Sequence, residues 1–235
     1  MRTLTLRFGQ LTPNFLTNLW KEKPKLTPLF SALYGFNLLT YLQLSLSGVK
    51  LSTPEAKHFS LVLKELKQLE TFSIMFLGFD PENKYQGFRI FLASLKEIPK
   101  LSSLTMLLRE EKMGDEEVRF LGENLQGCQC LRSLILGFYD TDKLTEDSLQ
   151  YLSIGLKGLL LLKELRLIFE RKKAFKKEST SKFLESLTAL KYLESLSLIY
   201  YPREDESEIQ DFAKDLVEKK KFRRLTQFVL NHGRI

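Results

Sequence analysis

Residues 101–108 read Leu101-Ser102-Ser103-Leu104-Thr105-Met106-Leu107-Leu108, and this octet has the pattern of a half-buried strand. Leu104, Met106 and Leu108 alternate with the residues between them, so their side chains face the same side of an extended backbone. A period of two is typical of a β-strand that buries one face. We therefore predict a strand across this octet.

The residues that follow have the pattern of a turn and a helix. Gly114 suits a turn, and Asp115 is predicted as the N-cap of the helix. Glu116 and Glu117 then lie in the first turn, where the helix dipole favours negative charge. Apolar residues continue at helical spacing, at Val118, Leu121 and Leu125. Gly127 is a suitable helix stop, so one unit consists of strand, turn, helix and turn.

The pattern Leu-x-x-Leu-x-Leu, or a close relative of it, recurs at steps of 29 to 32 residues. The copies start at Leu39, Leu69, Leu101, Leu131, Leu162, Leu193 and Phe222. Apolar helical clusters lie between the copies, at Phe59, Leu63 and Leu66, at Phe91, Leu92 and Leu95, at Leu149, Leu152 and Leu156, at Phe183, Leu184 and Leu187, and at Ile209, Phe212 and Leu216. A fixed period of this length predicts a solenoid, because each unit buries its apolar face only against its neighbours. We predict one repeat domain over residues 39–235, with about seven repeats.

These residues resemble the ribonuclease-inhibitor type of leucine-rich repeat, and the resemblance covers residues 39–230. It implies an α/β fold: a right-handed leucine-rich-repeat solenoid, or horseshoe, with a parallel sheet on the concave face and helices on the convex face. The period is slightly longer than that of the family. The Asn or Cys that commonly follows the strand is also absent, and the residues there are Ser47, Leu77, Arg109, Tyr139, Glu170 and Tyr201. An apolar residue precedes each of them, which predicts longer strands than the family standard.

Residues 1–38 are predicted to form an N-terminal cap. Leu4, Leu6 and Phe8 alternate like one extra strand of the same array, at residues 3–8. The first 21 residues also contain Arg2 and Arg7 and no acidic residue, as mitochondrial targeting segments do. A structural cap and a targeting sequence are therefore both open interpretations of this segment.

Composition limits the class of protein. Hydrophobic residues make up 43% and charged residues 28%, which is too apolar for a disordered chain. No apolar run approaches the roughly 20 residues of a membrane span. Two cysteines are too few for a disulfide framework, so an intracellular location is expected, with the cytoplasm favoured and the mitochondrion as the alternative.

The net charge of +7 suits an acidic partner. Basic residues cluster at Arg171, Lys172, Lys173, Lys176 and Lys177, and again at Lys219, Lys220, Lys221, Arg223 and Arg224. Aromatic residues are not interleaved with these cations, as they are in single-strand binders. We interpret the clusters as solvated surface and keep weak nucleic-acid binding as an alternative.

Few residues suit catalysis. His58 and His232 are expected at opposite ends of the array, so neither a Ser-His nor a Cys-His pair is predicted. Zinc would usually need four Cys or His ligands, which this geometry separates. Acidic residues cluster at Asp140, Asp142, Glu146 and Asp147, without the glycine and spacing of a calcium-binding loop. We predict a chain that is not an enzyme and uses no cofactor or metal.

The outward side chains of the sheet are the predicted binding surface. Two outward columns are small and polar, whereas the third is mostly apolar. The predicted partner-binding residues are Met75, Leu77, Leu107, Tyr139, Ile168, Ile199, Tyr201 and Phe228. Good strand formers, or an N-terminal segment folded over the sheet, would also explain this stripe.

We accordingly predict a non-catalytic protein–protein interaction module, a structural subunit or adaptor of a larger assembly. The resemblance implies an alternative, the regulation of an enzyme, because repeats of this type occur in activators of Ran-like GTPases and in ribonuclease inhibitors.

Overall fold

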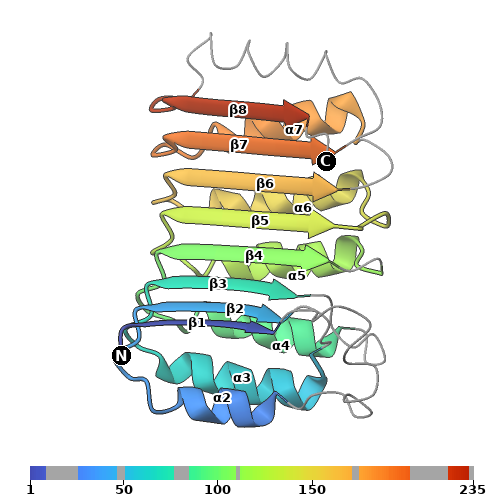
Figure 1. The fold of residues 1–235 in the computed structure, drawn as a ribbon. Coiled ribbons are helices and arrows are strands. Elements are labelled where there is room, and N and C mark those ends of the chain that lie inside the picture. Colours follow the sequence, from blue (N-terminus) through green and yellow to red (C-terminus); the bar gives the residue numbers. More distant parts are fainter. Residues whose placement is uncertain are drawn as a thin grey trace.

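The computed structural model describes residues 1–8, 26–46, 51–76, 85–109, 112–170, 175–201 and 222–232. In these residues eight strands form one sheet, in which every neighbouring pair is parallel and the spatial order follows the chain (Figure 1). The strands are β1 (Thr3–Phe8), β2 (Tyr41–Leu46), β3 (Thr71–Phe76), β4 (Ser103–Arg109), β5 (Ser133–Tyr139), β6 (Glu164–Glu170), β7 (Ser195–Tyr201) and β8 (Gln227–His232).

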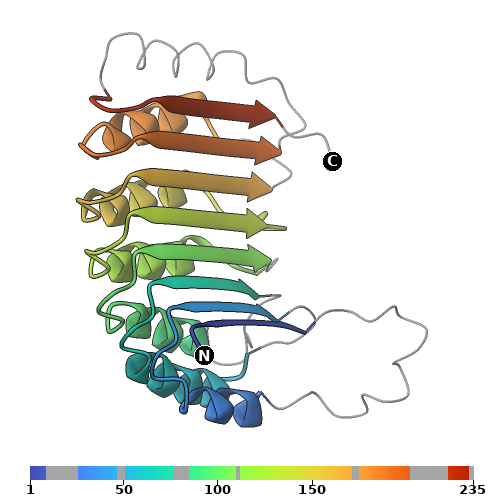
Figure 2. The ribbon, with the colours of Figure 1, turned by 60° about the vertical axis from the view of Figure 1, so that its left-hand side comes forward.

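The described helices all lie along one face of this sheet (Figures 1 and 2). They are α2 (Thr27–Leu33), α3 (Thr53–Glu65), α4 (Gln86–Leu95), α5 (Asp115–Leu125), α6 (Glu146–Lys157) and α7 (Lys177–Leu187). From β2 to β7 the chain alternates strictly between strand and helix. The predicted repetition of strand and helix on a parallel sheet is therefore confirmed.

The core lies between the sheet and the helices. Leu104, Met106 and Leu108 of β4 are at most 3% exposed, as the alternation in their octet predicts. The apolar clusters predicted for α3 to α7 are buried too, and that of the last predicted helix, Ile209 to Leu216, lies outside the described residues. Aromatic rings continue the core from repeat to repeat: Phe59 stacks on Phe30, with ring centroids 4.3 Å apart, and on Phe91, at 5.9 Å.

Acidic side chains connect the helix starts of adjacent repeats. Asp115, predicted as an N-cap, is instead the first residue of α5, and Gly114 occupies the cap position. One Asp115 carboxylate oxygen accepts hydrogen bonds from Thr145 N, at 2.8 Å, and from Ser148 Oγ; the other accepts one from Thr145 Oγ1, at 2.6 Å. Because Thr145 is the N-cap of α6, Asp115 satisfies donors of the neighbouring helix rather than those of its own.

The last strand corrects the predicted repeat phase. Leu196 of β7 is in register with Phe228, and Ser197 with Val229. Phe228 therefore belongs to the inward set and packs against the core, so its prediction as an outward binding residue is wrong. The seventh copy of the pattern starts at Leu225, three residues after the predicted start at Phe222, because Leu225-Thr226-Gln227-Phe228-Val229-Leu230 has the same apolar spacing.

At the other end, residues 3–8 form β1, which pairs in parallel with β2. Residues 9–25 lie outside the described part of the chain, so the choice between cap and targeting sequence stays open. Among the described helices, none combines the length and the apolar character that crossing a bilayer requires.

Candidate functional site

The sheet face away from the helices carries straight columns of side chains, because neighbouring strands pair in register. The first outward column is Thr3, Tyr41, Thr71, Ser103, Ser133, Glu164, Ser195 and Gln227. The second is Thr5, Gln43, Ser73, Thr105, Ile135, Arg166, Ser197 and Val229. The predicted repeat start at Phe222 would place Arg224 and Thr226 of the last strand in these two columns. The observed register places Gln227 and Val229 there instead.

These two columns form a hollow of about 370 Å³ over β5 to β8, here called the sheet hollow. Its lining residues are Ser133, Leu134, Ile135, Glu164, Leu165, Arg166, Ser195, Ser197, Ile199, Gln227 and Val229. The volume is within the range of pockets that hold ligands or segments of a partner. Because the serine side chains are short, they leave space above the sheet, and Ile135 and Val229 add apolar area beside them.

Two opposite charges lie in the sheet hollow. Glu164 and Arg166 are two residues apart on β6, so they share a face, and both are exposed. Lys163 and Glu194, just before β6 and β7, form an ion pair at 2.9 Å, whereas the side chains of Glu164 and Arg166 form no hydrogen bond or ion pair with the described residues. Both charges are therefore available to a ligand.

The predicted apolar stripe is only partly open. Met75 is 36% exposed, and Leu107 and Tyr139 are half-buried. Ile168 and Ile199 are only 7% and 6% exposed, so the prediction that they face solvent is wrong. Leu77 and the side chain of Tyr201 lie outside the described residues.

The cause of this partial burial at Tyr139 is a glycine two residues before it. A Cβ atom on Gly137 would lie 2.6 Å from Tyr139 Cε2 and 2.9 Å from Leu107 Cδ2, so the aromatic ring occupies the space that Gly137 leaves free. Arg109 borders the ring, with its Cζ 5.9 Å from the ring centroid and its Nε 3.1 Å from Asp140 Oδ2. Tyr139 and Leu107 of the stripe thus pack over Gly137, and the exposed Glu164 and Arg166 make the sheet hollow the more accessible site.

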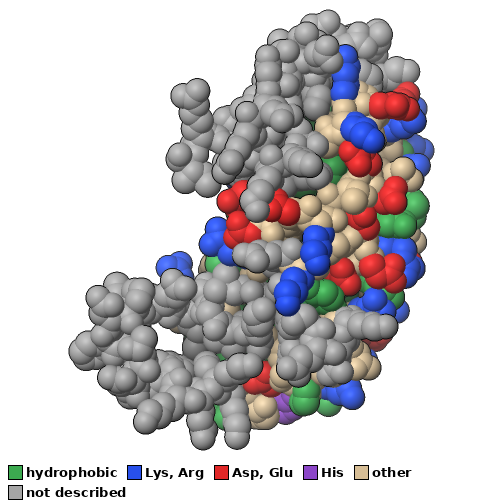
Figure 3. All heavy atoms as spheres, turned by 90° about the vertical axis from the view of Figure 1, so that its right-hand side faces the viewer, with side chains coloured by type: hydrophobic (Ala, Val, Ile, Leu, Met, Phe, Trp, Pro, Cys, Tyr) green, Lys and Arg blue, Asp and Glu red, His purple; other side chains and the backbone are tan. Residues whose placement is uncertain are grey.

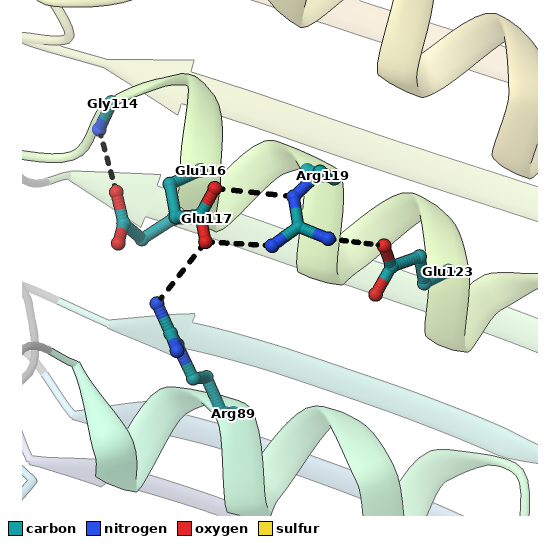
Figure 4. A network of polar contacts seen from close by, with 6 residues as sticks. All are labelled: Arg89, Gly114, Glu116, Glu117, Arg119 and Glu123. Atoms are coloured by element: carbon teal, nitrogen blue, oxygen red, sulfur yellow. Dashed lines mark hydrogen bonds and ion pairs between the residues drawn. The ribbon is translucent and has the colours of Figure 1, made fainter.

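Several charged groups on the helix layer pair with each other. Arg119 donates hydrogen bonds to Glu116 and to Glu123, and Arg89 reaches Glu116 at 3.7 Å (Figure 4). The Arg89 Cζ also lies 3.8 Å from the centroid of the Phe120 ring. The bonds to the arginines lower the pKa of Glu116 below its ordinary value, chiefly through Arg119. Figure 3, a view of the edge at which the strands end, shows acidic and basic side chains interspersed. This network connects α4 with α5 and offers no single-sign patch.

The expectation of no Ser-His pair is wrong, because His58 Nε2 of α3 lies 3.0 Å from Ser31 Oγ of α2 in an exposed contact. Cys128 lies in another repeat, after α5. Burial raises the pKa of the Cys128 thiol to about 12, which keeps it protonated and weakly nucleophilic. In the part of the chain that the structure describes, no three His, Cys, Asp or Glu residues are grouped so that they could hold a metal ion.

Compared with models of known protein families, the chain matches none, and no curated protein matches it significantly. The alternation of strand residues that predicts two polar outward columns also places Glu164 and Arg166 in them, but the predicted binding residues were chosen among apolar side chains. The prediction missed Gln227 and Val229 through the shifted phase, which the better match of the pattern at Leu225 could have revealed.

Proposed function

We propose that the chain is a leucine-rich-repeat horseshoe of the ribonuclease-inhibitor type that acts as a non-catalytic protein-interaction module, a structural subunit or adaptor. Its partner binds in the sheet hollow. The observation that supports this most directly is the position of Glu164 and Arg166, whose side chains have no ionic partner among the described residues and lie between small serines on a face that no described helix covers.

The chemistry of the hollow specifies a protein segment with charges of both signs. Arg166 offers a planar fork of donors that suits a carboxylate, and Glu164 accepts from an ammonium or guanidinium group. Four strands at about 4.8 Å spacing make the hollow about 14 Å wide, enough for an extended peptide or one helix. Ile135 and Val229 supply the apolar contact that such segments also need.

Affinity purification with three forms of the full chain tests this proposal. Arg166→Glu reverses a charge in the sheet hollow, and Lys182→Glu reverses one on α7, where the side chain is 73% exposed and forms an ion pair with the exposed Glu178. We expect wild type and Lys182→Glu to retain the same partner, and Arg166→Glu to weaken its binding at least about tenfold. A circular dichroism spectrum of each variant checks that it is folded. Equal retention by Arg166→Glu, or no retained partner at all, would refute the proposal.

Regulation of an enzyme is the alternative that the family resemblance offers. A retained partner that is a small GTPase or a nuclease, and whose rate changes when the chain binds, would favour it over an adaptor role.

A further inference from the structure

The turns that lead from each helix into the next strand lie side by side along one edge of the sheet, on the left in Figure 1. Backbone hydrogen bonds align them: Lys163 N donates to Arg132 O at 2.8 Å, Glu194 N to Lys163 O at 2.7 Å, and Thr226 N to Glu194 O at 2.8 Å. The turns at residues 126–132, 158–163, 188–194 and 222–226 are here called the turn edge.

Large apolar side chains protrude from the turn edge. Leu160 is 68% exposed, Leu161 40% and Tyr192 41%. Leu161 and Tyr192 occupy the same position in successive turns, and the next turn has Arg224 there, whose Cζ lies 4.8 Å from the Tyr192 ring centroid. These side chains sit at the tips of tight turns and not in a hollow, so they are presented outward, toward a surface.

The turn edge is also strongly basic. It contains five basic residues, Arg132, Lys163, Lys191, Arg223 and Arg224, and a single acidic one, Glu194, which is 2.9 Å from Lys163. The exposed Glu123 of α5 and Glu185 of α7 each lie three residues before one of these turns and are the acidic residues closest to the turn edge in sequence on the helix side. On the opposite edge, the turn at residues 140–146 carries three acidic residues and one basic residue. Residues 171–176, which connect β6 with α7 on that same opposite edge, carry four basic residues and no acidic one, so basic charge is present at both edges.

We propose that the turn edge docks on an anionic lipid membrane surface, with Leu160, Leu161 and Tyr192 entering the headgroup region. Protruding leucines, an aromatic ring with a polar tip, and surrounding cations are the combination that interfacial binding requires. A soluble polyanion would use the cations but would leave Leu160 in water. This surface is separate from the sheet hollow, so the inference does not rest on the proposed function.

Vesicle binding by the full chain tests the inference. Vesicles of phosphatidylcholine alone are compared with vesicles that contain about 30 mol% phosphatidylserine, and the bound fraction is measured by co-sedimentation. We expect binding only to the anionic vesicles, with a decrease as salt is added. The double variant Leu160→Ser with Leu161→Ser should lower the partition coefficient at least about tenfold.

A matched control removes two equally exposed aliphatic side chains elsewhere, through Leu61→Ser with Ile154→Ser, both 55% exposed on helices. This control should bind vesicles like the wild type. Arg166→Glu should also bind vesicles like the wild type, so that membrane binding and partner binding in the sheet hollow are tested separately. Absence of binding to anionic vesicles, or equal loss in the control, would overturn the inference. If the leucine variant binds anionic vesicles as strongly as the wild type, and both proteins bind heparin equally, the turn edge binds a soluble polyanion. That result would also overturn the membrane inference.

Discussion

Two glycines set how closely α5 and α6 approach each other. A Cβ atom on Gly155 would lie 2.6 Å from the backbone oxygen of Gly122, and a Cβ atom on Gly122 would lie 2.6 Å from the backbone oxygen of Tyr151. No rotamer change relieves such a contact, because the neighbouring atoms are backbone. The two helices can therefore keep this separation only while both residues lack a side chain.

Gly155→Ala should accordingly lower the free energy of unfolding by about 1–3 kcal/mol. The gain in helix propensity of about 1 kcal/mol only partly offsets the helix displacement. Urea unfolding followed by circular dichroism measures the change. Gly35→Ala is the control, because its Cβ meets nothing within 4 Å. A Gly155→Ala variant as stable as the wild type would contradict the close packing of α5 and α6.

The two cysteines differ in environment although one residue separates them. Cys128 is buried and Cys130 is exposed. Burial, and secondarily the nearby Cys130, raises the pKa of Cys128 from its ordinary value of 9.0 to about 12. Between these two values the folded state holds a proton that the unfolded state has lost, so the folded state binds more protons there.

The free energy of unfolding should therefore fall as pH rises from about 9 to about 12, and Cys128→Ala should make this decrease smaller. Comparison of urea midpoints for the two proteins across this pH range measures the effect. A thiol reagent at pH 8 provides a second measurement, in which Cys130 should react fast and Cys128 only after unfolding. Fast reaction of both thiols in the folded chain would contradict the burial of Cys128.

At the scale of elements, acidic side chains link helix starts across repeats. Asp115 of α5 accepts three hydrogen bonds from the first turn of α6. Glu146 of α6 accepts one from Lys176 N, the N-cap of α7, at 3.3 Å. Glu55 of α3 accepts one from Leu26 N, the N-cap of α2, at 2.8 Å. These bonds satisfy free backbone donors at helix starts and hold neighbouring helices at one level.

Asp115→Ala should lower the free energy of unfolding by about 1–3 kcal/mol, because it leaves Thr145 and Ser148 without their shared acceptor. Denaturant unfolding measures the change, with Asp147→Ala as the control. Asp147 is an exposed acid in the first turn of α6, so its loss removes little more than a helix-dipole contribution of about 0.3–1 kcal/mol. Equal effects of the two substitutions would show that Asp115 acts only as a local charge.

At the scale of the whole molecule, the repeat creates two surfaces that differ in character. The sheet hollow is concave and polar and carries one acidic and one basic side chain. The turn edge has protruding apolar side chains and an excess of basic residues. The two surfaces arise from different parts of each unit, the outward strand positions and the helix-to-strand turns. A protein segment in the hollow and a lipid surface at the edge could therefore be bound at the same time, so the chain could hold a partner at a membrane.

The sequence by itself determined the repeating strand and helix, the parallel sheet and most of the core. Burial with a period of two in residues 101–108, and with helical period in residues such as Val118 and Leu121, is a local property that each repeat shows again. Only the tertiary structure decided three other features: the register of β8, the burial of Ile168 and the packing of Tyr139 over Gly137. They depend on which neighbouring strands and side chains meet, and a spacing pattern within one segment does not specify those contacts.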